Sequence, residues 1–254
     1  MNLKMTKSNI YLLECKGAYE MSKRTFDNFD EFAKDYRQIH NENIKVSGVD
    51  SDFFSEYKII EIKNNELNNK KVTKILDLGC GDGNGTRFFR NHFPKAEIYG
   101  VDVSKDSIEV AKSRNIRNSK FVSYDGSVLP FEGETFDIIL IACVMHHIDI
   151  NYHKSVINEA LRVLKKNSNL YIFEHNPYNP VTRKVVSDCV FDEDAVLLNP
   201  QYTKRLVKNV GFKTAKTKFT IFFPRKGLFR KVIFLEKYLA KVPLGGQYYV
   251  AATK

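Results

Sequence analysis

From about residue 71 to the last residue, short apolar runs alternate with longer amphipathic stretches. Short runs bounded by polar or turn residues predict buried strands, and apolar residues spaced three and four apart predict helices. The predicted strands are 74–78, 97–101, 120–123, 136–142, 169–173, 212–223 and 248–252, and the predicted helices are 84–92, 105–115, 152–165 and 201–210. This alternation predicts an α/β fold with a doubly wound, seven-stranded, mostly parallel sheet.

The first seventy residues have a different pattern. Phe26, Phe29, Phe32, Tyr36 and Ile39 recur at helical spacing between charged residues, which predicts an amphipathic helix. A second helix is predicted over 52–63, and the polar run 63–71 then reads as a surface connection. We therefore expect an N-terminal helical lid or extension over 1–70 and a main domain over 71–254.

Composition and charge narrow the class of protein. Of the 254 residues, 43% are hydrophobic and 28% charged, which indicates a globular protein. The net charge of +10 is concentrated at one end, since residues 201–254 contain thirteen Lys or Arg and one acid, Glu236. Such asymmetry favours an anionic partner (a phosphorylated substrate, a membrane surface or RNA), although a solvated lysine-rich surface explains it equally well. Basic residues are not interleaved with aromatic ones in the way that stacks bases, so no nucleic-acid partner is expected.

The region 225–242 reads as a helical insertion between the last two predicted strands. Its part 227–242 has the pattern of a basic amphipathic helix, which either packs on its own domain or lies on an anionic membrane. No apolar run approaches the ~20 residues that span a bilayer, and the amino end lacks the apolar block of a signal peptide. We expect a cytoplasmic protein, with peripheral contact at the inner membrane face as an extension of that expectation.

The sharpest motif is DLGCGDG at residues 77–83, where a predicted strand ends in glycines and a helix begins. Glycines there let the backbone turn tightly and approach a ligand closely. The spacing GxGxG, two residues after Asp77, differs from the GxGxxG of nicotinamide and flavin dinucleotide sites. A dehydrogenase is therefore the weaker interpretation.

Two further acids end the next two predicted strands. Asp102 follows Gly83 by 19 residues, where a carboxylate accepts hydrogen bonds from ribose hydroxyls, and Asp125 follows the third strand. Parallel strands expose their carboxyl ends at one edge of the sheet, so both acids are expected beside the glycine loop.

Together these residues resemble a class I S-adenosylmethionine (SAM)-dependent methyltransferase, most densely over residues 70–175. The resemblance implies a Rossmann-like methyltransferase fold with SAM as cofactor. It assigns the methionine part of SAM to the glycine loop, the ribose to Asp102 and the adenine amino group to Asp125. In small-molecule members a tyrosine of an N-terminal lid helix reaches the cofactor, a role that falls here to Tyr36. The full set of implied cofactor contacts is Tyr36, Asp77, Gly79, Gly81, Gly83, Asp102, Val103, Asp125, Gly126 and Cys143.

A hydroxyl acceptor would need a base, for which histidine suits neutral pH. His147, after the fourth predicted strand, and His175, after the fifth, qualify by position, and either is also compatible with a purely structural role. We expect alanine at one of them to abolish turnover without changing cofactor affinity. No His, Asp or Glu cluster has metal-ligand spacing in the sequence, so no metal is expected.

The donor-rich segment 175–198 is the predicted substrate loop, with Tyr178 and Arg183 as substrate residues. Arg183 has the forked donors that grip a phosphate or carboxylate. The segment also resembles a bacterial subgroup associated with surface-glycan and nucleotide-sugar biosynthesis. The leading expectation is therefore methyl transfer to a small anionic acceptor, a hydroxyl of a sugar-derived or phosphorylated metabolite in surface-polysaccharide biosynthesis. The alternatives are a quinone or lipid methyltransferase, then an RNA methyltransferase or a non-catalytic cofactor-binding protein.

Overall fold

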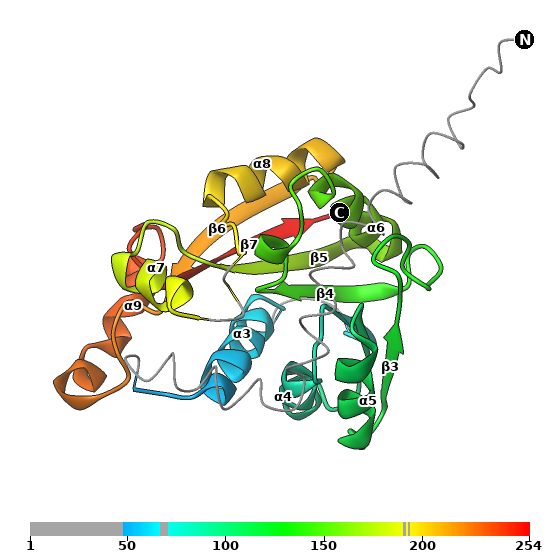
Figure 1. The fold of residues 1–254 in the computed structure, drawn as a ribbon, viewed down its shortest axis with the longest axis horizontal. Helices are drawn as coiled ribbons and strands as arrows, with labels where there is room; N and C mark the ends of the chain where they lie inside the picture. The colour runs from blue at the N-terminus through cyan, green and yellow to red at the C-terminus, as the bar shows by residue number, and fades with distance from the viewer. Residues whose placement is uncertain (1–47, 67–70, 190–191, 193) are drawn as a thin grey trace, which may run out of the picture.

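The computed structural model describes residues 48–66, 71–189, 192 and 194–254. One seven-stranded sheet runs through the molecule in the order β3-β2-β1-β4-β5-β7-β6, with helices on both faces (Figure 1). All strands are parallel except β7, which runs antiparallel to both of its neighbours. The predicted fold class is confirmed.

The strands are β1 Lys74–Leu78, β2 Glu97–Asp102, β3 Ser119–Ser123, β4 Phe136–Ala142, β5 Leu164–His175, β6 Thr214–Thr220 and β7 Gln247–Thr253. The α-helices among the described residues are α3 Ser51–Glu66, α4 Asn84–His92, α5 Lys105–Ser113, α6 His153–Val163, α7 Pro180–Ser187, α8 Pro200–Val210 and α9 Glu236–Leu239. Short 3₁₀ turns cover Met145–His147, Gly227–Lys231 and Ile233–Leu235.

Successive strand residues point to opposite faces and so build two cores. Leu76 and Leu78 of β1 pack with α6 and α8 on one face, where Ile157 and Val207 are fully buried. Ile75, also of β1, packs on the other face with α3 and α4. Both faces are thus covered, which is the usual state of a parallel sheet and explains why its central strands are almost wholly apolar.

The helix α3 belongs to the second of these cores. Ile59 and Ile62 are fully buried against the sheet, and Glu66 accepts hydrogen bonds from Asn169 and Tyr171 of β5, at 2.7 Å each. The predicted helix 52–63 lies within α3. The other predicted N-terminal helix, with Tyr36, lies outside the described residues.

Three sequence predictions are wrong in detail. The predicted strand 212–223 extends only to Thr220, because Ile221 takes a left-handed conformation (φ 62°) that ends the strand. The predicted helix over 225–242 is instead two 3₁₀ turns and the single turn α9, none of which has a buried residue. Short helices gain most of their stability from packing an apolar face, and this segment has only partly buried apolar residues, such as Val232 and Leu239.

The third error concerns the predicted substrate loop 175–198, which contains the helix α7. Asn179 caps this helix by accepting hydrogen bonds from the backbone of Val181 and Thr182, at 2.9 and 3.0 Å, and Pro180 occupies its first turn. An Asn cap followed by Pro is a helix start. The segment therefore presents a rigid element to any substrate.

The turn before β7 brings the beginning of β7 to the carboxyl end of β5. His175 pairs with Gln247, and the side chain of Asn176 donates to the backbone oxygens of Pro243 and Gly245 at 3.1 and 2.7 Å. A side chain on Gly245 would lie 2.4 Å from the backbone oxygen of Thr220, so only glycine fits this approach. The residues just before β7 consequently border the edge of the sheet where the predicted site lies.

Candidate active site at the carboxyl edge of the sheet

The glycine loop after β1 has the conformation that its sequence predicts. Gly79, Gly81 and Gly83 have positive φ angles of 77°, 50° and 76°, which side-chain-bearing residues seldom adopt. A Cβ atom on Gly79 would lie 2.4 Å from a methyl carbon of Val144, just after β4. The absence of a side chain at Gly79 therefore lets the glycine loop press against the segment that carries the histidine pair.

Space is open in front of Gly81, where a Cβ atom would meet nothing within 4 Å. Its backbone N–H donates to Asp102 Oδ2 at 2.8 Å, and Ser104 N–H donates to Asp102 Oδ1 at 3.0 Å. A carboxylate has about four acceptor sites, so Asp102 retains capacity for ribose hydroxyls. Val103 follows it directly and is partly buried. Bare backbone beside a carboxylate at a strand end is the arrangement that SAM needs, so these residues fit the cofactor.

Asp77 lies beneath this loop. Its carboxyl group is buried, accepts a hydrogen bond from Thr86 Oγ1 at 3.4 Å, and lies 3.3 Å from where a Cβ on Gly85 would be. Burial, helped by the charge of Asp102, raises the pKa of Asp77 to about 7. This residue therefore supports the loop from inside the protein.

Asp125 and Gly126 follow β3 at the same edge. The Asp125 carboxylate accepts hydrogen bonds from the hydroxyl and the backbone N–H of Ser127 at 2.6 and 2.9 Å, and the hydroxyl bond chiefly lowers its pKa. The residue is exposed, and Gly126 turns the chain with a φ of 81°. An ionised, exposed carboxylate here is available to an adenine amino group.

The chain leaves β4 through Cys143, a non-glycine residue with a positive φ of 57°. Its N–H donates to the Phe173 oxygen at 2.8 Å, and burial raises the pKa of its thiol. Left-handed conformations at side-chain-bearing residues are costly and concentrate at functional sites. The turn at Cys143 directs the following residues over the end of β5.

Those residues include the pair His146 and His147, whose rings lie 4.1 Å apart. Glu174 of β5, fully buried, accepts from His146 Nδ1 at 2.5 Å and from the backbone N–H of Met145 at 3.0 Å. His146 Nε2 and His147 Nε2 each lie 3.4 Å from Asp192 Oδ1. Two strand ends and a distant loop thus converge on one polar cluster.

Charge in this cluster is unevenly distributed. Burial opposes a charge on His146, but the Glu174 and Asp192 carboxylates outweigh it and raise its pKa well above the usual range. Burial and then the charge of His146 lower the pKa of both His147 and His175 to about 4. His147 and His175 are therefore neutral at pH 7, with a ring nitrogen able to accept a proton.

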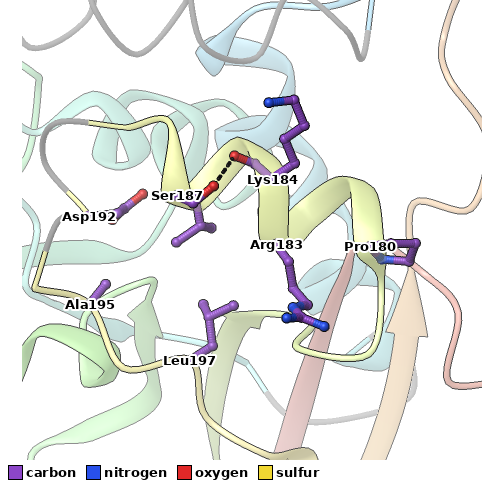
Figure 2. Close-up of a pocket in the computed structure, with 8 residues that line it drawn as sticks. Pro180, Arg183, Lys184, Ser187, Asp192, Ala195 and Leu197 are labelled. Carbon is purple, nitrogen blue, oxygen red and sulfur yellow. Dashed lines mark hydrogen bonds between the residues drawn. The ribbon is translucent and has the colours of Figure 1, made fainter.

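A pocket of about 530 Å³ lies beside the cluster and shares Asp192 with it. Its lining residues are Pro180, Arg183, Lys184, Val186, Ser187, Asp192, Ala195 and Leu197. The Arg183 side chain extends from α7 toward Leu197, whereas the Lys184 side chain points away (Figure 2). Lys184 pairs with Asp188 at 2.9 Å, so Arg183 is the basic group that faces the pocket.

The predicted site residues are only partly brought together. Arg183 lines the pocket, but Tyr178 is exposed and is not among the lining residues. Sequence reasoning missed the roles of His146, Glu174 and Asp192. The His-His and Glu-His pairs were visible in the sequence, but their junction with Asp192, which is 45 residues after His147 and 17 after His175, depends on the fold.

Comparisons with known proteins agree with this geometry. A methyltransferase domain family matches residues 75–167. An uncharacterised protein of Methanocaldococcus jannaschii is 30% identical over 201 residues, which cover 76% of this chain and 85% of that protein. A demethylmenaquinone methyltransferase of Thermotoga maritima is 34% identical over 106 residues, 42% of this chain, and the match spans only 45% of that relative's length.

Among solved structures, a SAM-dependent methyltransferase from Archaeoglobus fulgidus superposes with a TM-score of 0.60 over 81% of this chain and 95% of that one. At 18% identity this likeness concerns the fold alone. The matched domain begins in β1 and contains the glycine loop, Asp102 and the histidine pair. On these grounds, residues 75–167 form a methyltransferase domain, within a chain whose fold is that of SAM-dependent methyltransferases.

Proposed function

We propose that this protein methylates a lipid-soluble, quinone-type acceptor at an anionic membrane surface. The observation that carries the proposal is the segment 226–239, here called the basic tip. It exposes Leu228, Phe234 and Tyr238 to 76%, 62% and 71% of their surface. Exposed apolar side chains grouped in this way mark contact sites with membranes or other proteins.

The charge of the basic tip favours the membrane over a protein partner. Lys226, Arg230, Lys231 and Lys237 are all exposed. The one acid of the region, Glu236, is engaged internally, because it pairs with Arg225 at 2.7 Å. The four basic side chains therefore face solvent without a nearby acid from their own segment, and each adds about 1 kcal/mol of attraction to an anionic bilayer.

The basic tip is anchored to the body of the protein. Glu236 also accepts from the backbone N–H groups of Phe222 and Phe223 at 2.9 and 3.1 Å, and the Arg225 guanidinium lies over the Phe53 ring of α3 at 5.3 Å. In Figure 1 the segment, which includes α9, projects from the body below α7. A projecting segment that is fixed to the body in this way is suited to contact a membrane surface.

The pocket lined by Arg183, in which we place the acceptor, lies on the same side of the molecule as the basic tip. A few residues after the tip, the backbone oxygen of Leu244 accepts a hydrogen bond from the Asn179 side chain at 2.7 Å. The backbone oxygen of Gly246 accepts one from Thr182 Oγ1 at 2.9 Å. Asn179 and Thr182 begin α7, the helix that supplies Arg183 to the pocket. An acceptor embedded in a bilayer beneath the tip therefore has a short route to the pocket.

Two observations favour a quinone-type acceptor: the name of a relative and the residues that line the pocket. The Thermotoga maritima relative is named a demethylmenaquinone methyltransferase. The pocket combines apolar walls, among them Val186 and Leu197, with the charged residues Arg183, Lys184 and Asp192. Arg183 would also suit the anionic sugar acceptor expected from the sequence, but the relatives described above carry no glycan-related name. None of the helices in the described ranges is long and apolar enough to cross a bilayer.

Bound SAM supplies a methyl group activated by its sulfonium. The chain holds it through the glycine loop and Asp102 and orients the acceptor against it. We assign the base to His175, because His147 Nε2 lies against Asp192 at 3.4 Å. Burial and then the charge of His146 lower the pKa of His175 to about 4, so the ring is neutral and free to take the acceptor proton. The Asp192 and Glu174 carboxylates offset part of the cost of the imidazolium that forms. Replacing His175 by Gln should lower kcat ~10²–10⁴-fold and leave affinity for S-adenosylhomocysteine unchanged.

The test uses demethylmenaquinol, the reduced form of the quinone that has a nucleophilic ring carbon and a hydroxyl proton to lose, held under a reductant in vesicles that contain anionic lipid. We expect cosedimentation with anionic but not zwitterionic vesicles, and SAM-dependent methylation of the embedded acceptor. A variant carrying Leu228→Ser and Phe234→Ser should lose vesicle binding and turnover on vesicles while keeping turnover in detergent. Ile150→Ser, a change at a residue 61% exposed outside the tip, is the matched control. Methylation of nucleotide sugars with none of the quinone would refute the proposal.

A further inference from the structure

We propose that His146, His147 and Asp192 bind a divalent transition-metal ion beside the acceptor pocket. One donor atom from each of the three residues lies within 4.8 Å of the others. Two of these residues follow β4 and the third lies in the loop after α7. The sequence predicted no metal, because Asp192 is distant from the histidines along the chain.

The distances fit an ion better than direct hydrogen bonds. Each histidine Nε2 lies 3.4 Å from Asp192 Oδ1, whereas a charge-assisted N–H···O bond is usually about 2.7–2.9 Å long. Ligands of a tetrahedral zinc ion at about 2.0–2.1 Å lie roughly 3.3 Å from one another. The two N···O separations therefore match the ligand spacing of such an ion.

The surroundings hold the ligands as metal-binding proteins do. His146 presents Nδ1 to Glu174 Oε2 at 2.5 Å, which leaves Nε2 directed at Asp192. A carboxylate behind a histidine fixes the ring and raises its basicity as a ligand. The side chain of Glu174 is fully buried and unavailable to solvent. Its position is that of a supporting residue, not of a ligand.

The backbone around the pair is also fixed. His153 Nε2 lies 2.9 Å from the backbone oxygens of both Met145 and Ile148 and so holds the turn that carries the pair. On the other side, Val196 N–H donates to the His146 oxygen at 2.9 Å and ties the Asp192 loop to the same turn. Ligand positions set in advance in this way reduce the entropy lost when an ion binds.

The ligand set indicates the class of ion. Two imidazoles and one carboxylate suit Zn²⁺, Fe²⁺, Co²⁺ or Mn²⁺, whereas Mg²⁺ prefers oxygen ligands throughout. Three protein ligands leave at least one coordination position open. Because Asp192 also lines the pocket, an acceptor hydroxyl can take that position, where the ion would lower its pKa and ease transfer of its proton to His175. This role rests on the proposed function, but ion binding itself does not.

Binding is tested without any acceptor, on tag-free protein freed of metal by a chelator. Titration with Co²⁺ should give saturable visible absorption at one ion per chain, and Zn²⁺ should displace it. Asp192→Ala and His147→Ala should each weaken Co²⁺ binding more than 10-fold, and Glu174→Gln should weaken it about 10–100-fold. His92→Gln removes a histidine paired with Glu56 outside the cluster, and it should bind Co²⁺ like the wild type.

Affinity for S-adenosylhomocysteine, measured on every variant, reports whether the fold survives. The metal site is refuted if wild-type protein shows no saturable Co²⁺ or Zn²⁺ binding, because the cluster then holds a proton shared by His146, Glu174 and Asp192. It is also refuted if folded Asp192→Ala binds Co²⁺ as tightly as wild type. Loss of quinone methylation with intact ion binding would refute only the proposed function.

Discussion

Asp77 should make the protein less stable as the pH rises from about 4 to about 7. Burial raises its pKa from 3.8 to about 7 in the folded state, while the unfolded chain keeps the ordinary value. The folded state therefore binds this proton more tightly than the unfolded state, and it loses stability as the proton leaves. Well below pH 4 both states are protonated and Asp77 has no effect. Above pH 7 its full cost is present.

The magnitude follows from the pKa difference. Each pKa unit corresponds to about 1.4 kcal/mol, so the cost at alkaline pH is roughly 4 kcal/mol. Between pH 5 and pH 8 the change is ~2–3 kcal/mol, because part of the cost already exists at pH 5. Asp77→Asn removes the titration and can still accept the hydrogen bond from Thr86. The free energy of unfolding of the variant, relative to that of the wild type, should therefore be ~2–3 kcal/mol higher at pH 8 than at pH 5.

The assay is urea unfolding of both proteins, without cofactor, at several pH values between 5 and 8. Taking the difference between variant and wild type cancels the titration of all other groups. Asp137→Asn is the matched control, because hydrogen bonds from Lys165 and Thr73 lower the pKa of Asp137 against the effect of burial. This carboxyl group stays ionised over the whole range, so its difference from wild type should be constant. A constant difference for Asp77→Asn as well would refute the reasoning.

Two further predictions concern the cofactor edge. Asp102→Ala removes the acceptor of the Gly81 N–H and the acceptor that we expect for the ribose hydroxyls. At about 1.5–3 kcal/mol for hydrogen bonds to a charged group, it should weaken S-adenosylhomocysteine binding at least ~10-fold by calorimetry. Unchanged affinity would remove Asp102 from the site. Gly100→Ala would place Cβ 2.6 Å from Phe121 Cδ1 and 2.8 Å from Cys80 Sγ, so urea unfolding should show a loss of ~1–3 kcal/mol. Adding Phe121→Leu should recover part of that loss, and a Gly100→Ala variant as stable as wild type would contradict this packing.

The sequence alone determined the sheet and its cofactor edge. Apolar periodicity located all seven strands and α4–α6 and α8, because each pattern reports which side of one element is buried. The glycine loop and Asp102 were equally predictable, since a left-handed turn and a strand end are local features with local residue requirements.

Only the tertiary structure decided what lies beyond that edge. The periodicity of 225–242 predicted a helix, but a short periodic pattern becomes a helix only where a partner surface covers it. Here several apolar residues, including Leu228 and Phe234, stay exposed. The meeting of His146, His147 and Asp192 depends on how the loop after α7 folds back onto β4. Contacts between distant segments depend on the packing of the whole domain, which no window of sequence contains.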